Sequence, residues 1–561
     1  MLDVLQFGAG PMDYAIIAVY FVFVIGIGWL AKRRISTSID FFLSGRSLPA
    51  WVTGFAFISA NLGAVEIMGM SADGAQLGMP TMHYYWIGAV PAMLFLGIVM
   101  MPFYYGSKAR SVPEFMRRRF GPGAHLVNAL SFTLAQVLIA GVNLFLLGAL
   151  IEGLLGWPMW VSIVSAAAIV LLYTAMGGLS AAIYNEVLQF FVIIAALLPL
   201  TLLGLHRVGG WNGLVEKVTS STGGSEQLAS WPGQALSGFD SPWLSVVGIV
   251  FGLGFVLSFG YWTTNFVEVQ RAMASNSMTA ARNTPIIGSF PKMFVPFLVV
   301  IPGMIAAVMV TSLVDYKAAQ TADPSFKGAV DYNDALLLLM KDVLPNGLLG
   351  VAITGLLASF MAGMAANISA FNTVFSYDLW QQYIRKDRSD SYYLRIGRLA
   401  TVGATVIAIG TAFIAGTYNN LMTYLQSLFG FFNAPLFATF ILGMFWKRMT
   451  AAAGWIGLVS GTVAALFVFL LGEFNVIVLS GQGNAFLSAS AAFVVDIVVS
   501  VAVSLHSKAK PVSELVGLVY SATPRDRLHD PVADTLPWYR RPVPLASISL
   551  VLVIGLNVMF F

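Results

Sequence analysis

The sequence predicts an all-α polytopic membrane protein, and three observations support this fold class. The 561-residue chain is 58% hydrophobic and only 10% charged, whereas a soluble protein carries roughly 25% charged residues. Its apolar runs repeatedly reach the ~20 residues that a helix needs to cross a bilayer. These runs are continuous rather than alternating, which disfavours a β-barrel. The composition therefore excludes a soluble globular protein. The lack of cysteine excludes disulfides and thiolate sites.

About fourteen membrane-spanning helices are expected along the chain. They cover residues 14–31, 50–72, 81–104, 124–150, 157–176, 181–205, 242–268, 286–312, 344–376, 395–416, 420–444, 451–471, 487–505 and 543–560. The first has no basic segment before it and is followed by Lys-Arg-Arg. That order is typical of a retained first helix rather than a cleaved signal peptide.

The basic residues orient these helices. With segment 32–46 in the cytoplasm and the sides alternating from there, the cytoplasmic segments hold 24 Lys and Arg and the outer loops hold 5. Such a bias is the positive-inside pattern of membrane proteins. We therefore expect a multi-pass protein of the cell (plasma or inner) membrane with both termini outside.

Two long polar loops, 206–240 and 313–340, divide the chain. Five spans precede the first loop after the initial helix, and five follow it, so the second set runs opposite to the first. This is the arrangement of an inverted-repeat transporter. The expected parts are an extra helix and cytoplasmic loop (1–47), the inverted-repeat core (48–448), two flanking helices (449–506), a cytoplasmic linker (507–541) and a last helix (542–561).

The first core helix contains Asn61-Leu62-Gly63 and, one turn later, Glu66. Asparagine and glycine are poor helix formers and lower the cost of a break. A broken helix frees carbonyls that can hold a cation and a half-helix N-terminus that can hold an anion. A carboxylate within a membrane costs of order 3 kcal/mol and is usually functional. The alternative is a structural pairing of Glu66 with a lysine or a backbone donor.

The helix after the first long loop has a similar glycine-bearing stretch at 251–265. Two interrupted helices, each first in its half, predict a site near the middle of the membrane. The alternative is that these glycines only permit close helix packing.

Two further charged residues fall within or beside the spans. Lys292 stands among four prolines, about 6 residues or roughly 9 Å into its helix. It either reaches back to the inner surface or pairs with Glu66, which would neutralise both charges. Glu186 is expected near the start of a helix, where the helix dipole favours an acid, or it serves as a cation-pathway carboxylate.

Six stretches resemble motifs of the sodium:solute symporter family. They are FFLSGRSLPAW, SVPEFMRRRFG, AMGGLSAAIYNEVLQ, YWTTNFVEVQRAMAS, FVPFLVVIPG and ILGMFWKRMT. The resemblance implies a LeuT-like inverted-repeat core with flanking helices, in agreement with the topology above. It also implies a secondary active transporter, not an enzyme, whose partners are a small solute and the lipid bilayer. No nucleic acid, obligate protein partner or cofactor besides a coupling ion is expected.

The resemblance also implies a set of solute-binding positions. They are Glu66, Met70, Tyr85, Ser258, Tyr261, Trp262, Lys292 and Gln426, with Tyr261 closing the site from the inside. Three of them depart from the sugar-binding pattern, in which a glutamine stands at Glu66, a glutamate at Tyr85 and an asparagine at Ser258. The expected solute is therefore a sugar-like or another hydroxylated or anionic molecule.

The resemblance places a Na⁺ site where the first and eighth core helices meet. Its positions are Ser59, Leu62, Ser359, Ala362 and Gly363, with Glu186 resembling an additional acidic cation position. The family's two serines are Ala362 and Gly363 here, so two oxygen ligands are missing. By analogy with other hard cations, Na⁺ needs about five or six oxygens. Na⁺ coupling is expected, with a proton-coupled or ion-independent carrier as the alternative. A channel or a sensor is less favoured, because no rings of like charge and no soluble domain stand out.

Overall fold

The computed structural model describes residues 7–32, 42–323, 326–418, 421–479 and 482–561. All regular secondary structure in these ranges is helical, which confirms the predicted fold class. Most of the expected cytoplasmic segment 32–46 lies outside the described residues.

Within the described ranges, 12 helices are long and apolar enough to cross a membrane, or 13 with one bent pair counted as a single span. The long continuous helices are α2 (Pro11–Lys32), α9 (Pro122–Leu155), α10 (Met159–Val208), α20 (Leu348–Thr373), α21 (Asp390–Ala415), α22 (Leu421–Phe445), α23 (Ala451–Glu473), α24 (Gly483–His506) and α27 (Pro542–Met559). Composite spans cover Met79–Gly106, Pro242–Thr264, Leu348–Ile384 and Met278–Met309, the last made of α16 (Met278–Lys292) and α17 (Val295–Met309).

The count of fourteen is not confirmed, and the difference lies in α10. Helical backbone runs through both expected spans, 157–176 and 181–205. Its first part, Met159–Leu172, is apolar but shorter than a full span.

The first core helix is broken as its sequence predicts. Helix α4 (Ala50–Asn61) ends at the asparagine, and the chain resumes as a helix over Val65–Leu77, which includes α5 (Met70–Leu77), at an angle of 59°. The last backbone bond of α4 runs from the Leu62 N–H to the Ile58 carbonyl, 2.9 Å away. The break therefore falls within the three residues that separate the two halves.

The second glycine-bearing stretch behaves differently. The span Pro242–Thr264 remains helical through the expected interruption at 251–265, with a wide-turn segment over Gly248–Ser258. The chain leaves the helix only at Asn265, whose side chain accepts a bond from the Val267 N–H and begins α15 (Phe266–Met273). The glycines here serve packing, which was the alternative reading of this stretch.

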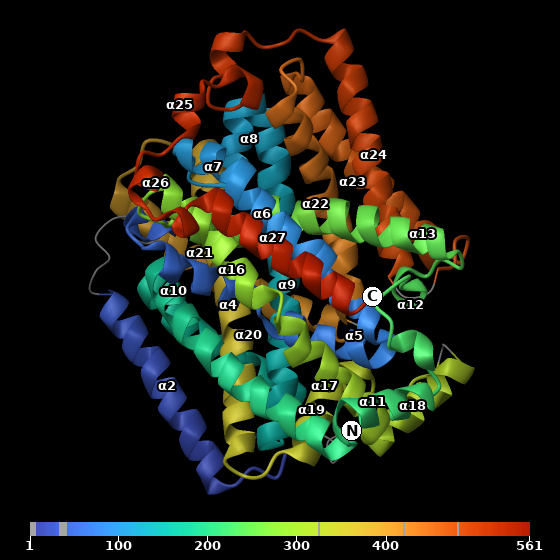
Figure 1. Cartoon of the computed structure of the whole chain (residues 1–561). Coiled ribbons are helices and arrows are strands. Elements are labelled where there is room, and N and C mark those ends of the chain that lie inside the picture. The colour runs from blue at the N-terminus through green and yellow to red at the C-terminus, as the bar shows by residue number, and fades with distance from the viewer. Residues whose placement is uncertain (1–6, 33–41, 324–325, 419–420, 480–481) are drawn as a thin grey trace.

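The two ends of the helical bundle carry different segments (Figure 1). Helices α8 (Val112–Phe120) and α25 (Arg525–Leu528), from the basic segments, lie at one end. Helices α11 (Gly210–Thr219) and α18 (Thr311–Ala322), from the long polar loops, lie at the other. This separation is what alternating spans require.

The linker 507–541 lies against the core rather than away from it. The Asp530 carboxylate accepts bonds from both the N–H and the hydroxyl of Thr279, each 2.7 Å long. An acid at the first turn of α16 is favoured by the free N–H groups and the helix dipole. The linker thereby anchors the helix that ends at Lys292, and α27 then packs along the same helix.

Candidate functional site

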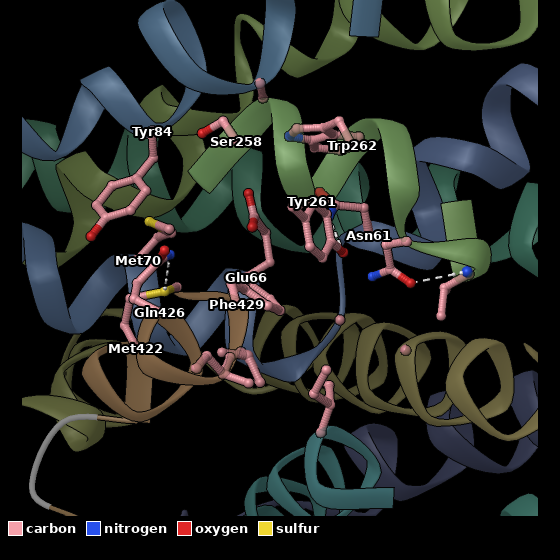
Figure 2. A pocket seen from close by; sticks show the side chains of 18 of the residues that line it. Asn61, Glu66, Met70, Tyr84, Ser258, Tyr261, Trp262, Met422, Gln426 and Phe429 are labelled. Atoms are coloured by element: carbon pink, nitrogen blue, oxygen red, sulfur yellow. Dashed lines mark hydrogen bonds between the residues drawn. The ribbon is translucent and has the colours of Figure 1, made fainter. Parts of the chain in front are cut away.

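A cavity of about 100 Å³ lies beside the break in the first core helix. Its walls come from both halves of the core. Its polar lining residues are Asn61, Glu66, Tyr84, Asn143, Ser258, Tyr261, Trp262, Asn265, Lys292, Asn367 and Gln426. Figure 2 shows the Glu66 carboxylate among these side chains, with Met70 and Gln426 on one side and Tyr261 on the other. The break thus opens onto a polar chamber inside an apolar protein.

An ion pair crosses the cavity wall. The Lys292 ammonium donates to Glu66 Oε1 at 2.5 Å and to the Asn61 side-chain oxygen. The Lys292 side chain is only 2% exposed, whereas that of Glu66 is 14% exposed. Lys292 therefore does not reach back to the membrane surface. The pairing with Glu66, one of the alternatives drawn from the sequence, is the one that the structure has.

Two aromatic rings surround the buried end of Lys292. Its ammonium lies 4.8 Å from the centre of the Tyr85 ring and 5.3 Å from that of Trp262. Cation–π contacts of this kind are strongest where water is excluded. The rings and the carboxylate together hold the lysine in place, so that Glu66 is the charged group that the cavity meets.

Most of the expected solute-binding positions gather at the cavity. Those that line it are Glu66, Met70, Ser258, Tyr261, Trp262, Lys292 and Gln426. The exception is Tyr85, which is fully buried behind Lys292. Its neighbour Tyr84 lines the cavity instead. The sequence predicted the correct turn of the helix. Of the two adjacent tyrosines in it, Tyr84 and not the expected Tyr85 lines the cavity.

Tyr261 closes one side of the cavity through two hydrogen bonds. Its hydroxyl accepts from the Asn61 side-chain amide at 3.1 Å and donates to Glu268 Oε1 at 3.0 Å. Its ring packs on Phe429, with ring centres 4.6 Å apart. The tyrosine therefore connects the helix break to α15, and the expected gating residue is held in place from both sides.

At the expected cation position the protein's own groups bond to one another. The Ser359 hydroxyl donates to the Leu62 carbonyl, which is one of the oxygens assigned to the ion. Ala362 provides no side-chain oxygen, while the Ser59 hydroxyl is buried without a partner among the described residues. These positions offer fewer oxygens than a hard cation of this kind needs. The side chains present do not by themselves fit the family's Na⁺ site.

A close backbone contact explains why no serine stands at residue 363. A Cβ on Gly363 would lie 2.8 Å from the Asn143 side-chain oxygen and 2.9 Å from the Gly63 Cα. That oxygen accepts a bond from the Ala64 N–H at 3.1 Å, within the helix break. Asn143 and the two glycines thus join the break to α9 and α20 directly.

Glu186 occupies a different environment from the other expected cation positions. It lies within α10 (Met159–Val208). Its carboxylate pairs with Arg271 at 2.6 Å, and both side chains are at most 1% exposed. Glu186 does not line the cavity. The carboxylate balances a buried guanidinium.

Sequence reasoning missed two side chains that shape this region. Asn143 lines the cavity, and Glu268 holds the hydroxyl of Tyr261. Asn367, on a polar face that the sequence of α20 does show, lines the cavity as well. A lone amide in an otherwise apolar run, such as Asn143, was the available signal. Glu268 gave a weaker signal, because it stands at the end of a span, where a charged residue is ordinary.

Comparisons with known proteins agree on the fold and class. The model of the sodium:solute symporter family matches residues 41–461. The sodium/glucose cotransporter of Vibrio parahaemolyticus is 30% identical over 479 residues, which are 83% of this chain and 86% of that protein. The sodium/myo-inositol cotransporter 2 of Sus scrofa is 28% identical over 478 residues, 82% of this chain and 70% of that protein.

A solved structure adds independent support for the fold. A Na⁺-coupled sialic acid symporter in its substrate-bound, outward-open state matches with a TM-score of 0.74. The match covers 89% of this chain and 98% of that chain at 19% sequence identity. At such low identity the likeness concerns the fold alone, and it agrees with the LeuT-like architecture expected from the sequence.

Proposed function

Because this chain belongs to the sodium:solute symporter family, we propose that it takes up a small polar organic solute by cation symport with alternating access. Family membership makes it a membrane transporter and not an enzyme. The proposed solute is sugar-like, or another hydroxylated or anionic molecule, and the proposed coupling ion is Na⁺.

The observation that carries this proposal is the cavity beside the broken helix. Its carboxylate and amide groups, Glu66, Asn367 and Gln426 among them, can accept and donate hydrogen bonds to hydroxyl groups. Met70 and Trp262 provide the apolar surface on which the carbon skeleton of a sugar-like solute packs. Mid-protein sites at a helix break are where transporters of this architecture hold their solutes.

The Lys292–Glu66 pair takes part in solute binding by exchanging hydrogen-bond partners with the solute. Lys292 and Glu66 neutralise each other when the cavity holds water, so the site carries no net charge from this pair. A solute hydroxyl or carboxylate can replace one partner of each group, since the 14% exposed carboxylate is within its reach. Tyr261 then separates the solute from α15 until its two hydrogen bonds break.

A second candidate keeps the fold and changes the coupling. Gly363 approaches Gly63 too closely for a side chain, Ala362 has no side-chain oxygen, and the Ser359 hydroxyl donates to the Leu62 carbonyl. These observations favour a proton-coupled or ion-independent carrier over a strict copy of the family's Na⁺ site. In that case the buried carboxyl groups carry the coupling proton.

Uptake into proteoliposomes tests both candidates. Radiolabelled D-glucose, myo-inositol and sialic acid are supplied under an imposed Na⁺ gradient, an imposed proton gradient, or neither. The proposal expects accumulation of at least one of them that Lys292→Met abolishes. A Na⁺ gradient as the driving force supports the first candidate, and a proton gradient supports the second. Equal, gradient-independent equilibration would contradict symport, and no uptake of any of the three would contradict the proposed solute class.

A further inference from the structure

A continuous series of hydrogen bonds leads from the cavity to the buried carboxyl group of Glu268, which is not among the expected site residues. Lys292 contacts both Glu66 and Asn61, Asn61 donates to the Tyr261 hydroxyl, and that hydroxyl donates to Glu268. The series ends there. The second carboxyl oxygen of Glu268, Oε2, is buried without a hydrogen-bond partner among the described residues.

The charges around this series of hydrogen bonds balance only if Glu268 is neutral. Among the described residues, Lys292 pairs with Glu66 and Arg271 pairs with Glu186. Each buried cation near Glu268 thus already has a carboxylate of its own. Glu268 is fully buried and forms no ion pair in the described part of the chain. An ionised Glu268 would be a third negative charge against two positive ones, with one oxygen removed from water and unsatisfied. Burial of such an unpaired charge is strongly disfavoured.

We propose that Glu268 is a proton-binding site that Tyr261 connects to the solute cavity. The ligand is a single proton taken from water; one O–H bond forms and no other covalent bond changes. The role of this proton in solute binding rests on the proposed transport function. The proton site itself can be tested without transport. It adds a titrating group to the machinery that is separate from the expected cation position.

Protonation changes what Tyr261 can offer to the cavity. With Glu268 ionised, the tyrosine hydrogen is committed to Oε1. With the proton on Oε1, the carboxyl group donates to the tyrosine oxygen, which has two lone pairs and can accept from Asn61 as well. The Tyr261 hydrogen is then free to point into the cavity that its side chain lines. Proton binding therefore adds one hydrogen-bond donor to the solute site. By linkage, a solute that accepts this bond raises the affinity of Glu268 for its proton.

The charged and titratable groups that face Glu268 come from four elements. They are Arg271 on its own helix α15, Lys292 on α16, Glu186 on α10 and Tyr261 on the preceding span. The two cations favour ionisation of Glu268, while Glu186 opposes it, and each cation is partly neutralised by its own partner. The protonation of Glu268 therefore depends on whether Glu66 remains paired with Lys292.

Infrared difference spectroscopy on the purified full-length protein, in lipid nanodiscs, tests the site without any solute. A protonated carboxyl group gives a C=O stretching band that a carboxylate lacks. We expect the neutral-pH spectrum of the wild type to contain such a band that is lost in Glu268→Gln. Asp496→Asn is the matched control. Asp496 is also a buried carboxyl group, but it bonds to Thr439 and Ser500 and does not belong to the hydrogen-bonded series from Lys292 to Glu268. It should leave the Glu268 band in place.

A second variant keeps the test decisive if Glu268→Gln does not fold. Tyr261→Phe removes the hydrogen-bond partner of Glu268 and should shift the band without abolishing it. A neutral-pH band that neither Glu268→Gln nor Tyr261→Phe alters, or the complete lack of a protonated-carboxyl band, would overturn the inference. Because the spectra need no transport, failure of the uptake experiment overturns the proposed function alone.

Discussion

The buried ion pairs Arg271–Glu186 and Lys292–Glu66 differ in what surrounds them. Arg271 and Glu186 are at most 1% exposed and are enclosed by α15 and α10. Lys292 and Glu66 have the same kind of charges, but the carboxylate side is 14% exposed and faces a cavity. A sealed pair can only stabilise the arrangement of its helices, whereas a pair on a cavity wall can exchange a partner for a solute. The two pairs therefore differ in the exposure of the carboxylate, which is sealed in Glu186 and reaches the cavity in Glu66.

The largest expected effect is on the sealed pair. Arg271→Met removes the buried partner that Glu186 has among the described residues, and loss of one member of a buried pair costs about 3–5 kcal/mol. We expect a large drop in thermal stability of the detergent-solubilised protein. The exposed pair of His529 and Asp534 provides the control, because Asp534→Asn should change stability by less than about 1 kcal/mol. Equal stabilities of Arg271→Met and Asp534→Asn would show that the sealed pair is not structural.

A smaller loss of stability but a full loss of uptake is expected at the cavity pair. Lys292→Met leaves Glu66 charged, but water in the cavity can solvate it, so the cost should be about 1.5–3 kcal/mol, as for a bond to a charged group. The double variant Lys292→Met/Glu66→Met, which removes both charges, should recover stability and not uptake. Melting curves and proteoliposome uptake, measured on the same preparations, separate the two quantities. Recovered uptake in the double variant would contradict a role for the pair in solute binding.

The next largest loss of stability is expected where the helices pack beneath the Lys292–Glu66 pair. In Gly363→Ala the new Cβ would press on Asn143 and on the backbone of Gly63, and such overpacking costs about 1–3 kcal/mol. Gly403→Ala in α21 is the same substitution where nothing lies within 4 Å, and it should be neutral or slightly stabilising. A melting temperature of Gly363→Ala equal to that of Gly403→Ala would show that the break and α20 do not need this contact.

The smallest effect on stability, and the most specific one, is expected at Glu268. If its protonation supplies the Tyr261 donor to the cavity, uptake at low solute concentration should fall as pH rises through the titration of Glu268. Glu268→Gln imitates the neutral carboxyl group and should flatten this decline, with little change in the melting temperature. Uptake of the same labelled solute between pH 5 and pH 9 measures the profile. A decline in Glu268→Gln that matches the wild type would assign the titration to a different group.

The sequence by itself determined most of the architecture. Continuous apolar runs can only be membrane helices, since backbone polar groups must be satisfied within each segment in lipid. The break at Asn61–Gly63 was also readable, because two poor helix formers stand together in one apolar run. At 251–265 the same reasoning placed the break among the glycines, whereas the helix is interrupted only at Asn265. The glycines pack against neighbouring helices there, which no single segment reveals.

Only the tertiary structure decided the partners of the charged groups. Glu66 and Lys292 are 226 residues apart in the chain, and Glu186 and Arg271 are 85 apart. Periodicity along the sequence gives no account of such distances. Local composition sets the cost of placing a charge in the membrane, but which opposite charge lowers that cost depends on how distant helices pack. For the same reason the sequence could not identify the bond between Glu268 and Tyr261, or the close approach of Gly63 and Gly363.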